Sequence, residues 1–121
     1  MNTAVIGLVA MFFLGMGIFG LIAPATLIKP FGITLASAEA RTEVRAVYGG
    51  FGVAIALLLA CAAADIAELR PGAVVAVGIA LAGMAFGRLV GRMADRPARF
   101  YPSWFYFWVE SLGAAALIAA S

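Results

Sequence analysis

The chain has 121 residues, of which 65% are hydrophobic and only 12% are charged, and its formal net charge is +2. Soluble domains carry about a quarter charged residues, so this composition excludes an ordinary soluble protein and indicates a single membrane domain over residues 1–121. One cysteine and no histidine exclude an internal disulfide and leave no zinc pattern, no cofactor motif is present, and no basic stripe indicates a nucleic acid partner.

The first apolar run covers residues 3–23 and contains no charged residue. At about 1.5 Å per residue its length matches the roughly 30 Å of a bilayer's hydrocarbon core, so it predicts a transmembrane helix. No positive segment precedes it and no Ala-x-Ala site ends it, so we expect it to be retained rather than cleaved as a signal peptide. Gly7, Ala10, Gly17 and Gly20 fall near one face, which favours close contact with another helix.

Residues 24–36 are predicted to form a loop along the membrane interface. Ser37 is suited to begin a helix that runs through residues 41–50 to residue 64 and crosses the membrane over 44–64. Gly49 and Gly50 weaken such a helix, so we expect close contact with a neighbouring helix there to compensate.

Three polar residues at the start of this span are candidates for a binding site. Arg45 and Tyr48 lie one turn apart and share a face. They are either interfacial anchors or a cationic, hydrogen-bonding lip for an anionic head group. Glu43 lies on roughly the opposite side from Arg45 and is expected to pair with an arginine nearby.

Residues 65–70 form a polar turn, and Pro71 suits the first turn of a third span over 71–91. This span contains Gly83, Gly87 and Gly91 at intervals of four. Small residues at this spacing indicate a close-packing face. We favour packing within the chain over a seam between two copies.

Residues 92–99 form the most basic loop, with Arg92, Arg96 and Arg99. The aromatic run that follows suits the membrane surface and opens a fourth span over 101–120. Glu110 lies ten residues beyond Phe100, about 15 Å of helix, which places it near the bilayer midplane.

Arg88 and Glu110 are the charged residues deepest in the predicted spans. Glu110 is either a buried carboxylate bonded to a neighbouring helix, or a proton carrier or ligand contact. Arg88 either extends to the head groups or turns inward toward Glu110 or Tyr48, and we favour the inward orientation. We therefore expect a small bundle closed around these two residues and Glu43, Arg45 and Tyr48.

Basic residues are strongly biased toward one set of loops. The connections between spans one and two and between spans three and four carry almost all of them, while the middle connection carries only Arg70. The positive-inside rule therefore predicts that loops one and three are cytoplasmic and that both termini lie outside.

The segment 41–50, the Gly87-Arg88 pair, the turn 95–97 and the aromatic run ending in Glu110 together resemble small bacterial membrane proteins grouped as domain of unknown function 4345. The resemblance covers nearly the whole chain and implies a four-helix membrane protein with some likeness in size and layout to DoxX-like proteins. Together with the apolar runs and the basic loops, it leads us to expect an all-α, integral membrane, antiparallel four-helix bundle in the bacterial inner membrane. It brings no established activity, and it implies Glu43, Arg45, Tyr48, Arg88 and Glu110 as the residues to test first.

No pattern of residues predicts a catalytic site or a metal site. We therefore expect a non-enzymatic protein that binds membrane lipid or a small amphiphile, or that serves as an accessory subunit of a homo-oligomer or larger membrane complex. One alternative is a small proton-coupled transporter that works as an oligomer through Glu110. The other is an intramembrane enzyme acting on a lipid or quinone-like substrate.

Overall fold

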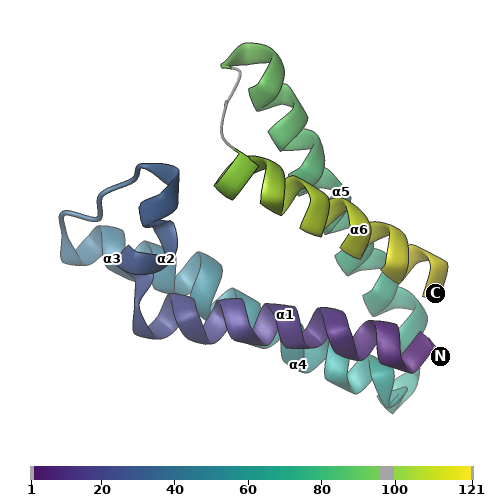
Figure 1. The fold of residues 1–121 in the computed structure, drawn as a ribbon. Helices are drawn as coiled ribbons and strands as arrows, with labels where there is room; N and C mark the ends of the chain where they lie inside the picture. Colours follow the sequence, from purple (N-terminus) through teal and green to yellow (C-terminus); the bar gives the residue numbers. More distant parts are fainter. Residues whose placement is uncertain (1, 96–99, 121) are drawn as a thin grey trace.

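The computed structural model describes residues 2–95 and 100–120, which are largely helical and contain no strand. In chain order the elements are α1 Asn2–Ile22, α2 Pro24–Ile28, η1 Lys29–Phe31, α3 Ala38–Val44, η2 Arg45–Gly50, α4 Phe51–Ala63, η3 Ile66–Glu68, α5 Arg70–Ala94, η4 Phe100–Trp104 and α6 Phe105–Ala120 (Figure 1). Four helical segments are long and apolar enough to cross a membrane, which agrees with the four long apolar helices predicted from the sequence. These segments are Thr3–Ile22, Ala38–Ala63, Arg70–Ala94 and Phe100–Ala120.

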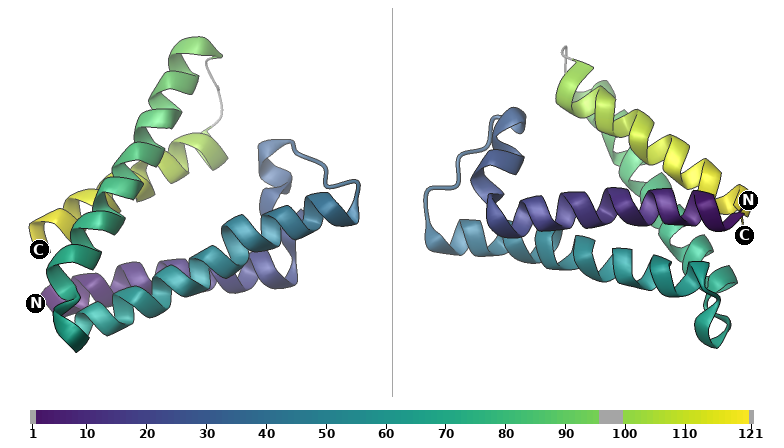
Figure 2. Two further views of the ribbon diagram at one scale, coloured as in Figure 1. Left: turned by 180° about the vertical axis from the view of Figure 1, so that it is seen from behind. Right: turned by 60° about the horizontal axis from the view of Figure 1, so that its bottom comes forward.

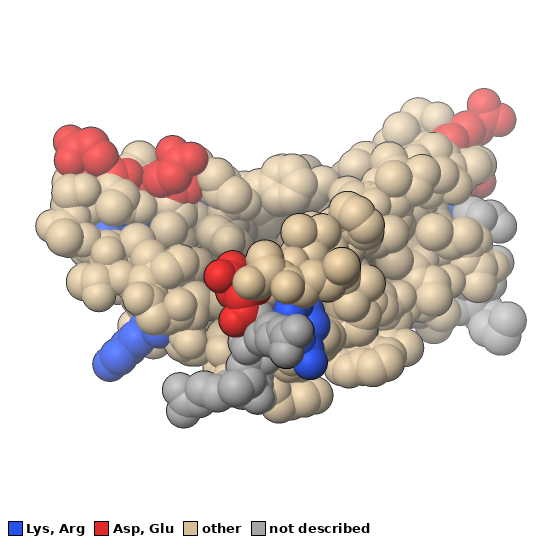
Figure 3. All heavy atoms as spheres, turned by 90° about the horizontal axis from the view of Figure 1, so that it is seen from above, with Lys and Arg blue, Asp and Glu red and all other residues tan. Residues whose placement is uncertain are grey.

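The surface of the molecule is mostly apolar. Large hydrophobic side chains are exposed along every span, among them Met11, Leu57, Phe86 and Leu112. The face in Figure 3 is covered mainly by uncharged residues, with acidic groups at both ends and at one place between them. Continuous apolar surface of this extent is typical of a protein that lies against lipid.

The four long helices form two pairs. α1 packs mainly on α4, and α5 packs mainly on α6, while contacts between the pairs are fewer. The two pairs meet where α1 begins and α6 ends, and they diverge away from that end (Figures 1 and 2). The expected bundle closed around the polar residues is therefore not seen, because among the described residues the four long helices share an apolar core where the two pairs meet.

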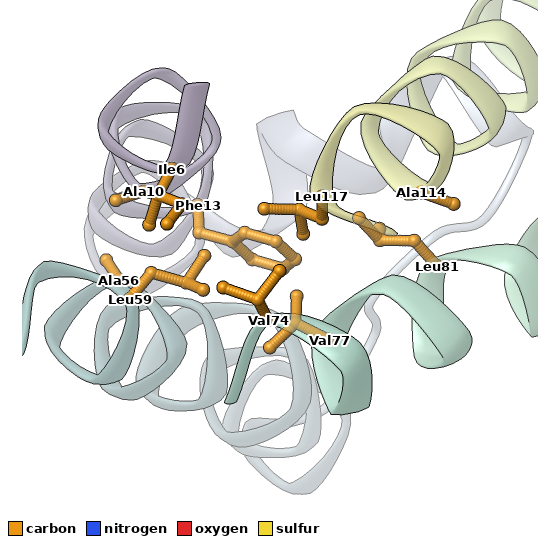
Figure 4. Close-up of a cluster of buried hydrophobic side chains, with 10 residues drawn as sticks. All are labelled: Ile6, Ala10, Phe13, Ala56, Leu59, Val74, Val77, Leu81, Ala114 and Leu117. Carbon is orange, nitrogen blue, oxygen red and sulfur yellow. The ribbon is translucent and has the colours of Figure 1, made fainter. Parts of the chain in front are cut away.

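That core contains residues from all four long helices and no polar group (Figure 4). Its buried members are Ile6, Ala10, Phe13, Ala56, Leu59, Val74, Val77, Leu81, Ala114 and Leu117. Since lipid tails are as apolar as these side chains, their contribution comes from close van der Waals contact rather than from escape from water.

Glycines bring α1 and the second span into close contact farther along the first pair. A Cβ atom at Gly17 would lie 2.6 Å from the backbone nitrogen of Val53, and one at Gly20 would lie 2.9 Å from that of Gly49. Any side chain at these two positions of α1 would collide with the other backbone. The predicted contact is confirmed at Gly17, Gly20 and Gly49, whereas a Cβ atom at Gly7 would meet no described atom within 4 Å.

The second span begins as predicted but contains an irregular turn. The Ser37 hydroxyl accepts a hydrogen bond of 3.0 Å from the amide of Ala40, which confirms it as the N-cap. Between α3 and α4, the element η2 winds as a π-helix. π-helical turns are rare in proteins, and those that occur are often found at functional sites.

The first connection is more ordered than the predicted loop. Pro24 begins α2, where its fixed backbone angle suits a first helical turn, and Leu27 and Ile28 are buried. Gly32 ends η1 in the left-handed conformation, at φ 77°. These two short helices do not follow from the sequence because they lack the length from which apolar periodicity can be read.

The remaining connections agree with the sequence in outline. The turn between α4 and α5 holds Asp65, Ala67 and Glu68 at positive φ, and α5 begins at Arg70 and continues to Ala94, beyond the predicted residue 91. Arg96 and Arg99 of the predicted basic loop lie outside the described residues.

Candidate functional site

The site is built where the buried faces of α5 and α6 end. On α6, Glu110 is followed by Ala114 and Leu117 at helical spacing, and all three are buried. On α5, Arg88 follows the buried residues Leu81 and Ala85 at the same spacing. The two charged residues therefore extend a continuous α5–α6 contact, which turns both side chains inward.

Arg88 and Glu110 form a two-point ion pair. Arg88 Nε donates to Glu110 Oε1 at 2.7 Å, and Arg88 Nη2 donates to Glu110 Oε2 at 2.9 Å. This parallel arrangement is the strong geometry for guanidinium and carboxylate. The structure thus has the inward orientation of Arg88 that the sequence analysis favoured.

The pair is unevenly exposed. The Glu110 side chain is 4% exposed, and that of Arg88 is 22% exposed. Both carboxylate oxygens of Glu110 are occupied by Arg88. Arg88 is therefore the more accessible member of the pair.

Two aromatic rings cover the guanidinium. Its carbon lies 5.6 Å from the centre of the Tyr106 ring and 5.9 Å from that of Phe31. The two rings stack on each other at 5.7 Å with an angle of 28°. Cation–π contacts of this kind stabilise an arginine in an environment poor in water.

Phe31 and Tyr106 were both missed in the sequence analysis. Tyr106 lies one turn before Glu110, so its shared face could have been read from the spacing. Phe31 belongs to η1, and its contact with α6 depends on the path of the first connection. No periodicity in the sequence carries that information.

An apolar crevice opens beside this group of residues, between the two helix pairs. We call it the α1–α6 crevice. It has a volume of about 280 Å³ and is lined by Met11, Phe12, Gly15, Met16 and Phe19 of α1, Leu27 of α2 and Tyr106 of α6. A neighbouring cavity of about 170 Å³ shares Phe12 and reaches Leu81 of α5. Tyr106 therefore takes part both in the lining of the crevice and in the contact with Arg88.

The other predicted polar residues do not join this site. Arg45 is exposed, and its Nε donates to the carbonyl of Leu21 in α1 at 3.1 Å. Tyr48 is half-buried beside it in η2, and Glu43 is exposed. Within residues 2–95 and 100–120 neither Glu43 nor Arg45 forms an ion pair, and the single expected cluster is replaced by two separate groups on the two helix pairs.

The predicted packing of Gly83, Gly87 and Gly91 within the chain is also wrong. A Cβ atom at any of the three would meet no atom of the described residues within 4 Å. The reason is that α5 packs on α6 through a different face, which includes Val77, Leu81 and Ala85. The three glycines form an open stripe, which we call the α5 glycine face.

Residues 2–95 and 100–120 contain no group of three or more Cys, Asp or Glu side chains that could hold a metal ion. The chemistry of the site is therefore that of an arginine–carboxylate pair between aromatic rings. Such a site can exchange hydrogen bonds and stack against a ligand.

Comparison with known proteins gives one result. The family described as "Domain of unknown function (DUF4345)" matches residues 1–121, which is the whole chain. No curated protein and no solved structure gives a significant match. The site must therefore be interpreted from its own geometry.

Proposed function

The chain belongs to the DUF4345 family, whose description names no activity, and we propose that it binds a single-chain membrane amphiphile at Arg88, Glu110 and Tyr106. The observation that carries this proposal is the position of Tyr106, which lines the α1–α6 crevice and whose ring centre lies 5.6 Å from the carbon of the Arg88 guanidinium. The crevice offers space for an apolar tail, and the guanidinium offers hydrogen bonds to a polar head.

The charge balance of the site restricts the head group. Glu110 already neutralises Arg88 at close distance, so a charged head would add an uncompensated charge at a site poor in water. A head that exchanges hydrogen bonds without net charge, such as the glycerol of a monoacylglycerol, fits these groups best.

A leucine at Gly15 tests the proposal directly. Gly15 lines the crevice, and a Cβ atom there meets no described atom within 4 Å, so a larger side chain can begin there without a backbone collision and extend into the crevice. We expect Gly15→Leu to lower photolabelling by a diazirine-bearing monoacylglycerol about tenfold, which corresponds to about 1.4 kcal/mol. The measurement is the labelling yield on α1 and α6 peptides after reconstitution in vesicles.

The matched control is Gly7→Leu, a substitution of the same kind on the same helix outside the crevice, which should leave this labelling unchanged. Equal labelling of the wild type and Gly15→Leu, or labelling spread evenly over all four spans, would rule out the crevice as the binding site.

We place the protein in the bacterial inner membrane, with loops one and three on the cytoplasmic side and both termini outside. The support is the excess of basic residues in those two loops. Labelling of intact cells by a membrane-impermeant reagent at a cysteine engineered in the turn 65–68 checks this, and protection of that cysteine would reverse the orientation.

The α5 glycine face supports a second function, that of an accessory subunit or homo-oligomer. Three glycines at intervals of four lie open toward the surroundings, and small residues at this spacing let another helix approach closely.

The substitution Gly87→Leu tests this second function. Energy transfer between labelled copies of this variant in vesicles should fall to the level of random mixing. The control is Gly72→Leu, at another open position of α5, which should leave energy transfer unchanged. An unchanged signal in Gly87→Leu would remove self-association through this face.

A further inference from the structure

A larger groove runs between α1 and α4 near the end where the helix pairs meet. We call it the α1–α4 groove. It has a volume of about 890 Å³ and is walled largely by small residues, among them Ala4, Gly7, Ala56 and Ala60. A void in an apolar surface forfeits dispersion contacts along its lining, so in a membrane this groove will be filled.

The length of the groove selects the occupant. Its lining residues on α1 extend from Thr3 to Leu14, which is about 16 Å along a helix. This is about half the thickness of the hydrocarbon core. An acyl chain occupies one leaflet and matches this length, whereas a transmembrane helix of a partner would need a groove of about 30 Å.

A cation lies at the polar end of the groove. Arg70 Nε donates to the Ala62 carbonyl at 3.1 Å, and Nη2 donates to the Thr3 hydroxyl at 3.1 Å and also to the Ala63 carbonyl. Thr3 and Ala63 both line the groove. The guanidinium is therefore fixed within hydrogen-bond distance of two lining residues.

The bonds of Arg70 leave part of its guanidinium available. They use Nε and Nη2, and no bond of Nη1 occurs to any residue in 2–95 or 100–120. A guanidinium held in this way presents its remaining N–H groups to a phosphate, for which its geometry is suited.

Two carboxylates accompany this cation. Asp65 and Glu68 are exposed in the turn that directly precedes Arg70. An anionic head group would meet two negative charges here, whereas a phosphoethanolamine head carries an ammonium group that matches them. The turn thus offers one positive and two negative groups to a head with one negative and one positive charge.

We propose that the α1–α4 groove binds phosphatidylethanolamine, with one acyl chain in the groove, the phosphate on Arg70 and the ammonium toward Asp65 and Glu68. This site shares α1 and Met11 with the α1–α6 crevice, but its second helix is α4 and its head-group chemistry is different. It does not depend on the amphiphile proposed for that crevice.

Native mass spectrometry after reconstitution in vesicles of equal phosphatidylethanolamine and phosphatidylglycerol tests the proposal. We expect wild-type protein to retain one phosphatidylethanolamine per chain, at least fivefold over phosphatidylglycerol. Gly7 lines the groove and a Cβ atom there meets no described atom within 4 Å, so Gly7→Leu should occupy the groove and abolish retention. Gly15 lines the crevice and not the groove, so Gly15→Leu should leave retention intact.

A second variant examines the head group without touching the packing of the helices. Because Asp65 and Glu68 are exposed, the double variant Asp65→Asn with Glu68→Gln should fold normally. It should retain phosphatidylethanolamine and phosphatidylglycerol about equally. Arg70 is left unchanged because its bonds to Thr3, Ala62 and Ala63 also hold the fold together. Retention by Gly7→Leu equal to the wild type overturns the groove assignment, and an unchanged preference in the double variant overturns the head-group assignment.

Discussion

Arg88→Met is expected to lower the free energy of unfolding by about 3–5 kcal/mol, because it leaves the buried Glu110 carboxylate without its partner. Glu110→Leu should cost less, about 1–3 kcal/mol, since Arg88 is partly exposed and its long side chain can extend toward the head groups. The measurement is reversible unfolding in mixed micelles with increasing sodium dodecyl sulfate, followed by circular dichroism.

The double variant Arg88→Met with Glu110→Leu measures the energetic coupling between Arg88 and Glu110, apart from the effect of each single substitution. Because no charge is then left buried, its stability should return to within about 1–2 kcal/mol of the wild type. Arg92→Met, one turn farther along α5 at an exposed position, is the matched control and should change stability by less than about 0.5 kcal/mol. A double variant as unstable as the sum of the two single variants would show that the residues are not energetically coupled.

Such coupling would also bear on the alternatives proposed for Glu110. A proton carrier or an acid–base catalyst must exchange protons with a substrate or with water. Glu110 is buried, and both of its oxygens accept from Arg88. These contacts support a structural role of Glu110 more directly than they support transport or catalysis.

Two kinds of structural feature follow from the sequence: those set by long apolar runs, and those set by the large free-energy cost of an unpaired charge in an apolar environment. The four spans are predicted because about 20 apolar residues average out local uncertainty. The inward orientation of Arg88 is predicted because an unpaired charge is costly beside hydrocarbon. Neither inference requires knowledge of how the helices are arranged.

Other features depend on the arrangement itself. Glycines at intervals of four mark a face of α5 as suited to close contact, but the same spacing serves a neighbour in the chain or a separate molecule equally well. The structure places the close contact at Gly17 and Gly49 and leaves Gly83 open. Likewise, the position of Phe31 against Arg88 is set by the fold of the first connection, which no periodic pattern describes.

Gly17→Ala is expected to destabilise the protein by about 2–3 kcal/mol through the addition of one methyl group. That methyl would lie 2.6 Å from the Val53 nitrogen and 2.9 Å from the Gly49 carbonyl oxygen, and neither backbone atom can move aside as a flexible side chain would. The helices must therefore separate, and helix pairs in lipid depend on close van der Waals contact. The same detergent titration measures the loss.

Gly15→Ala provides the matched control, because it adds the same methyl group to the same helix where no described atom lies within 4 Å. It should leave stability unchanged or raise it by a few tenths of a kcal/mol, since alanine is the better helix former. If both substitutions were neutral, the α1–α4 pair would be held by the apolar core around Ile6 and Leu59 rather than by the glycine contact. If only Gly17→Ala is destabilising, the glycine contact fixes the position of α1, and with it the spacing of both the crevice and the groove that α1 lines.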